Sequence, residues 1–152
     1  MKLFVLLSDH DNVELTDGFL QSISGLELLF EIYRTDFEIE LFKQYNNNEI
    51  TPIECLRRYQ KVRTFPEVLE TEYVILKAKE YDIKITPVGP CNISLFSDDF
   101  VNNFNKNILE NILKLLPAKN AGLLIGYKHE AILDHIPREL IIYNKPASVR
   151  AN

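Results

Sequence analysis

The segment from Gly122 to His135, GLLIGYKHEAILDH, constrains the fold most strongly. It begins inside a short apolar run, 121–126, that is typical of a strand buried on both faces, as in a parallel sheet covered by helices. Gly126 ends the run, and a short helix is predicted over 129–135. His129 therefore follows the carboxyl end of a strand, where open α/β sheets bind their ligands.

The beginning of the chain repeats this arrangement. Residues 3–8 form an apolar run that predicts a second strand, and His10 follows it between two aspartates. A neighbouring carboxylate can fix the tautomer of a histidine or raise its pKa. Asp11 and Glu14 come after the same strand, so both are candidates to assist His10 at the same sheet edge.

The rest of the chain alternates between strands and amphipathic helices. This alternation favours one three-layer α/β domain over residues 1–152, with a mainly parallel sheet and a long helical insertion after the first strand. Further strands are predicted at 83–88 and 140–143. Helices are predicted from about 18, over 26–45, 52–63, 64–81 and 100–116, the last capped by residues 97–99.

Composition excludes several classes of protein. The net charge of −5 and the pI near 5.2 argue against a nucleic-acid-binding protein, which usually presents a basic face. No apolar stretch approaches the length of a membrane span, so no membrane association is expected. Cys55 and Cys91 form no CxxC pair, and free thiols of this kind favour a reducing, cytoplasmic location.

Two short motifs resemble the superfamily of TraB and TIKI proteins, haem-binding ChaN proteins and erythromycin esterases. Gly126-Tyr-Lys-His129 resembles the Gly-x-x-His motif after their last strand, and residues 77–82 resemble their passage from helix to strand. Leu7 departs from the glycine that usually precedes their first histidine. The resemblance implies a hydrolytic or ligand-binding site formed by His10 and His129.

Two chemistries are open to such a site. Two histidines with a carboxylate can hold a divalent metal with one open position, so His10 and His129 are candidate metal ligands. The same two imidazoles can instead act as a general acid–base pair. Gly126 is a candidate cofactor-binding residue, since glycine allows a ligand to approach the backbone closely or takes a positive φ.

The functional hypotheses belong to two different classes. The first is a hydrolase or a domain that binds a small-molecule ligand, with His10 and His129 as its central residues. The alternative is a non-catalytic inhibitor or immunity-type protein whose acidic surface binds a basic protein partner. Each histidine could also be structural, and His135 is expected on the surface. Convergence of His10 and His129 would favour the first hypothesis.

Overall fold

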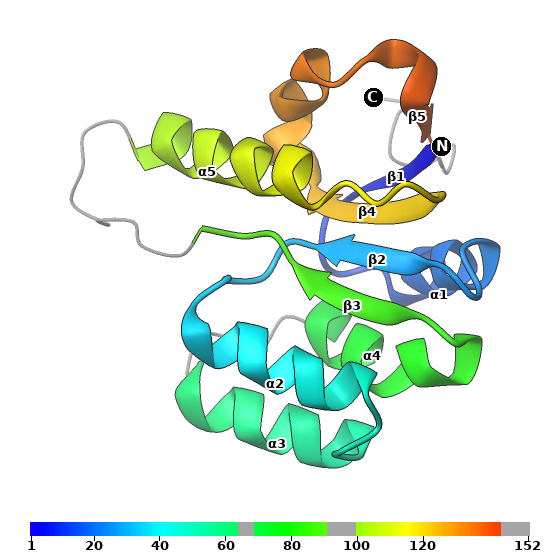
Figure 1. Ribbon diagram of the computed structural model, residues 1–152, viewed down its shortest axis with the longest axis vertical. Helices are drawn as coiled ribbons and strands as arrows, with labels where there is room; N and C mark the ends of the chain where they lie inside the picture. The colour runs from blue at the N-terminus through cyan, green and yellow to red at the C-terminus, as the bar shows by residue number, and fades with distance from the viewer. Residues whose placement is uncertain (64–68, 91–99, 144–152) are drawn as a thin grey trace.

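The computed structural model describes residues 1–63, 69–90 and 100–143, and its centre is a parallel sheet (Figure 1). Five strands lie in the order β3-β2-β4-β1-β5, and every pairing between neighbours is parallel. Their bounds are β1 Leu3–Ser8, β2 Glu27–Phe30, β3 Lys84–Pro87, β4 Ala121–Gly126 and β5 Ile141–Tyr143.

Helices cover both faces of the sheet and complete the three layers (Figure 1). One face packs against α1 Val13–Ser22, α2 Asp36–Asn46 and α4 Leu69–Lys77, and α3 Pro52–Val62 packs on α2 and α4. The other packs against α5 Phe100–Leu115 and the 3₁₀ helix η2 Tyr127–His135. Short 3₁₀ helices follow at η1 Ala78–Tyr81 and η3 Arg138–Leu140. Within the described ranges, no helix has the length and apolar character needed to cross a membrane.

Strand β4 lies at the centre of the sheet and separates two hydrophobic cores. Leu124 packs into the core beneath α1 to α4, whereas its neighbour Ile125 packs into the core beneath α5. Both side chains are fully buried. The prediction of a strand buried on both faces is therefore confirmed, because successive side chains of a strand point to opposite faces.

The prediction of one helix over residues 26–45 is wrong. Gly25 takes a φ of +79° after α1, and the next residues form strand β2. Helix α2 begins only after Thr35, which forms a capping box with Glu38. The apolar residues of this region recur at helical spacing, but Leu28, Leu29 and Phe30 are also a continuous run that fits a buried strand. Pairing with β3 and β4 decides between the two structures.

The remaining elements agree with the predictions in kind, but α1 begins at Val13, with Asn12 as its cap, and not near residue 18. The three-layer α/β fold is confirmed, and the long insertion after the first strand contains β2 as well as helices. Helix α3 agrees with the prediction of a helix over 52–63, and the side chain of Thr51 caps it. The short helix after β4 is a 3₁₀ helix that begins at Tyr127, not at His129. The predicted start at 64–67 and cap at 97–99 lie outside the described residues.

Candidate functional site

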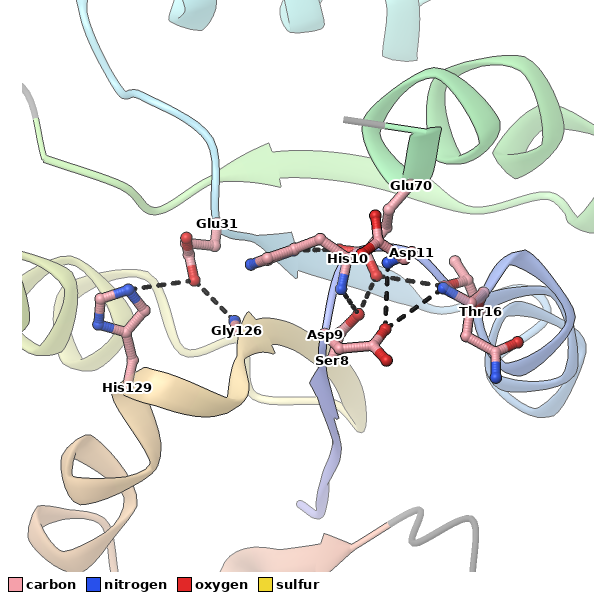
Figure 2. A network of polar contacts seen from close by, with 10 residues as sticks. Ser8, Asp9, His10, Asp11, Thr16, Glu31, Glu70, Gly126 and His129 are labelled. Atoms are coloured by element: carbon pink, nitrogen blue, oxygen red, sulfur yellow. Dashed lines mark hydrogen bonds and ion pairs between the residues drawn. The ribbon is translucent and has the colours of Figure 1, made fainter. Parts of the chain in front are cut away.

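Polar residues from three adjacent strands meet at the carboxyl edge of the sheet (Figure 2). His10 follows β1, Glu31 follows β2, and Gly126 ends β4, with His129 close behind it. Glu70 reaches the same edge from α4. The parallel register pairs Ser8 with Gly126, so the ends of β1 and β4 lie side by side. We call His10, Glu31, Glu70, Gly126 and His129 the histidine site.

His10 is held by its backbone and by Glu70. Its φ of +72° lies in the left-handed region, which is uncommon for residues other than glycine. The backbone N–H donates to Ser8 Oγ at 2.9 Å, and the ring Nδ1 lies 2.9 Å from Glu70 Oε1. With Nδ1 directed at a carboxylate, Nε2 is the ring nitrogen that faces the rest of the site.

Glu70 is a buried carboxylate with hydrogen bonds to both oxygens. Ser8 Oγ donates to Oε2, and Thr16 Oγ1 donates to the same oxygen at 3.2 Å, while Oε1 faces His10. The hydrogen bond from His10 to Glu70 raises the pKa of His10. Burial of the ring opposes this, whereas the charges of Glu70, Glu31 and Asp9 reinforce it. His10 therefore favours its protonated form relative to a free histidine.

His129 has a contrasting environment. Its Nδ1 lies 2.6 Å from Asn105 Oδ1, and its ring stacks on Phe104 with a centroid distance of 4.8 Å. Burial lowers the pKa of His129; the positive charges of His10 and Lys128 act in the same direction, and Glu31 opposes them. His129 therefore favours its neutral form, opposite to His10.

Glu31 lies between the two imidazoles (Figure 2). Its Oε1 accepts a hydrogen bond from the Gly126 N–H at 2.7 Å and lies 3.7 Å from His129 Nε2. On the other side, a Cβ built on Gly126 would lie only 2.6 Å from His10 Nε2. Gly126 has a φ of −64°, so it needs no positive φ. The glycine at this position instead leaves room for the imidazole of His10.

The structure brings together some of the predicted site residues and not others. His10 and His129 lie at one edge of the sheet. The side chains of Asp11 and Glu14 are exposed, and in the described ranges no hydrogen bond or ion pair joins either carboxylate to a histidine. The carboxylates beside the histidines are those of Glu70 and Glu31, in the place predicted for Asp11 and Glu14. His135 is exposed, as expected.

Glu31 and Glu70 were not foreseen from the sequence, for different reasons. Glu31 directly follows the apolar run 28–30, as His10 follows the run 3–8, but the helical spacing of the apolar residues over 26–45 hides the strand. Glu70 lies within a helix, 60 positions from its partner His10, and no local signal marks it. A contact of that separation is set by tertiary packing.

The described side chains form no ready-made metal centre. Across residues 1–63, 69–90 and 100–143, no group of three or more His, Cys, Asp or Glu side chains is arranged to hold a metal ion. Glu31 instead accepts the Gly126 N–H, and each histidine Nδ1 faces a side-chain oxygen. These contacts hold the three side chains in place at the sheet edge, and the divalent metal stays a prediction.

Comparisons with known proteins give no assignment. No protein-family model, no curated protein and no solved structure matches this chain. The resemblance to the TraB, TIKI, ChaN and erythromycin esterase superfamily therefore stays a prediction from the sequence.

Proposed function

We propose that this domain is a hydrolase of a small-molecule substrate, with His129 as general base and His10 as general acid. One observation carries the proposal: two imidazoles lie at one edge of the sheet in surroundings that shift their pKa values in opposite directions. Pairs of titratable groups separated in this way identify acid and base in many active sites. The carboxyl edge of a parallel sheet is also where α/β folds place their ligands.

His129 fits the role of base. Its lowered pKa leaves the ring neutral near pH 7, which a proton acceptor requires. With Asn105 Oδ1 accepting the Nδ1 proton, the lone pair of Nε2 is directed at the site. Stacking on Phe104 holds the plane of the ring, so the lone pair keeps one direction.

His10 fits the role of acid. Its raised pKa keeps more of the ring protonated near neutral pH, and Glu70 stabilises that imidazolium as a buried counter-charge. Because Nδ1 donates to Glu70, the proton available for transfer is on Nε2. The side chain of His10 is 37% exposed, so a ligand can reach it, whereas Glu70 is buried behind it.

The test is hydrolysis of chromogenic esters and phosphoesters by the purified chain. Activity of the wild type should have a bell-shaped pH dependence, and His10→Gln or His129→Gln should each lower it about 10²- to 10⁴-fold. His135→Gln is the matched control, because that histidine is exposed and lies outside the histidine site. Equal rates for the wild type and both site variants on every substrate would contradict the proposal.

The inhibitor or immunity-type alternative stays a prediction. The net charge of −5 is its basis, and no contact in the histidine site favours it. A chain without hydrolytic activity that binds a basic protein with a salt-sensitive affinity would support it.

A further inference from the structure

We propose that Glu31 positions the water that attacks the substrate, with Glu31 Oε1 and His129 Nε2 each accepting one of its hydrogen bonds. This inference rests on the proposed hydrolase function and adds a third functional residue to the two histidines. It assigns a role to a carboxylate that the folded chain places between them (Figure 2).

The separation of the two acceptor atoms suits a shared water molecule. Glu31 Oε1 and His129 Nε2 are 3.7 Å apart, which is too long for a direct hydrogen bond. When His129 is neutral and its Nδ1–H donates to Asn105 Oδ1, Glu31 Oε1 and His129 Nε2 present lone pairs to one another. Two facing acceptors need a donor, and a water beside the pair can donate one O–H to each.

Glu31 is held in place through both its backbone and its side chain. Its backbone N–H donates to Leu124 O at 3.1 Å, which continues the pairing of β2 with β4 past the end of β2. Its Oε1 accepts from the Gly126 N–H, and its side chain is 13% exposed. A group fixed in this way can orient a water without first losing side-chain entropy.

The charges around Glu31 agree with this role. His129 and His10 face it from either side. Its charge acts to raise both pKa values: it adds to the rise at His10, and at His129 it opposes the larger lowering by burial. Asp9 and Glu70 act on His10, and Lys128 acts on His129. The Glu31 carboxylate therefore stabilises the imidazolium that His129 becomes when it takes a proton.

The reaction step balances with these residues alone. The water oxygen forms a bond to the electrophilic carbon or phosphorus of the substrate, and one water proton moves to His129 Nε2. The bond to the leaving group breaks, and the leaving group takes the proton from His10 Nε2. His129 then releases its extra proton to solvent, and His10 takes up a proton from solvent.

The experiment compares Glu31→Gln with Glu14→Gln, a matched change at an exposed carboxylate outside the site. Glutamine retains an oxygen for the Gly126 N–H but removes the charge. Glu31→Gln should lower kcat at least about tenfold with little change in KM. Both limbs of the pH profile should move to lower pH, because the pKa values of His129 and His10 fall without the carboxylate. Glu14→Gln should match the wild type.

Nuclear magnetic resonance titration of the histidine rings gives a readout that does not depend on turnover. Glu31→Gln should lower the pKa of His129, and unchanged values for both histidines would overturn the inference. If Glu31→Gln does not fold, Glu31→Asp keeps the charge but withdraws the oxygen, so kcat should fall while the histidine pKa values stay closer to those of the wild type.

The outcomes separate this inference from the function on which it rests. An active wild type with an equally active Glu31→Gln would remove Glu31 from the mechanism and leave the two-histidine hydrolase standing. A wild type no more active than His129→Gln would remove the hydrolase, and the water-positioning role with it.

Discussion

Replacing Gly126 with alanine tests whether the ring of His10 must lie where the structure places it. The new Cβ would stand 2.6 Å from His10 Nε2 and 3.4 Å from Glu31 Oε1. Ordinary contact between a carbon and a ring nitrogen needs about 3.5 Å, so the ring has to move by roughly 1 Å. The backbone of Gly126 has a φ of −64°, which alanine adopts without strain. The change therefore acts on the ring and not on the strand.

The expected loss is catalytic and not structural. A displacement of about 1 Å in a reacting group costs on the order of 10²-fold in rate. The side chain of His10 is partly exposed and can swing outward, so the free energy of unfolding should change by less than about 1 kcal/mol. Gly126→Ala should therefore lower the hydrolysis rate while leaving the free energy of unfolding nearly unchanged.

Two other glycines provide matched controls. Gly18 lies in helix α1 with no atom within 4 Å of an added Cβ, so Gly18→Ala should stabilise the chain by about 0.5–1 kcal/mol and keep its activity. A Cβ on Gly122 would stand 2.5 Å from Ile23 Cδ1 in the core, so Gly122→Ala should cost about 1–3 kcal/mol.

Hydrolysis rates, urea denaturation and ring titration of His10 check this series. If Gly126→Ala keeps wild-type activity and the wild-type titration of His10, the ring does not depend on the space above Gly126, and the assigned geometry is refuted.

Two further predictions concern stability. Leu124→Ala and Ile125→Ala should each lower the free energy of unfolding by about 2–5 kcal/mol in urea denaturation, because both side chains are fully buried on opposite faces of the sheet. Leu113 is 47% exposed, so Leu113→Ala should cost under about 1 kcal/mol. Equal losses at all three positions would refute the two-core description. The raised pKa of His10 contributes stability that is complete below pH 6.5 and is lost as the pH rises through the pKa of His10 in the folded chain. The lowered pKa of His129 contributes stability that is present above pH 6.5 and is lost as the pH falls through the pKa of His129 in the folded chain. Urea denaturation from pH 5 to 9 should show His10→Gln removing the alkaline decline and His129→Gln the acidic one, and identical pH profiles for the wild type and both variants would contradict the assigned shifts.

The site could be predicted from the sequence where its residues follow strands directly. His10 and His129 were located by the apolar runs before them, and the parallel order of β1 and β4 brings both to one edge. Asp11 and Glu14 satisfied the same positional rule, yet they are exposed. Closeness to a strand end places a residue near the edge, but the loop conformation decides where its side chain points. The positive φ of His10 is part of that conformation.

The sequence by itself determined the α/β class, the buried central strand and the two histidines, because periodic burial and short apolar runs are local properties of a chain. The tertiary structure alone decided that residues 27–30 are a strand and that Glu31 and Glu70 accompany the histidines. A run of apolar residues satisfies helix and strand equally until neighbouring strands offer backbone hydrogen bonds. A carboxylate 60 positions from its imidazole becomes its partner only when packing of α4 on the sheet brings it there.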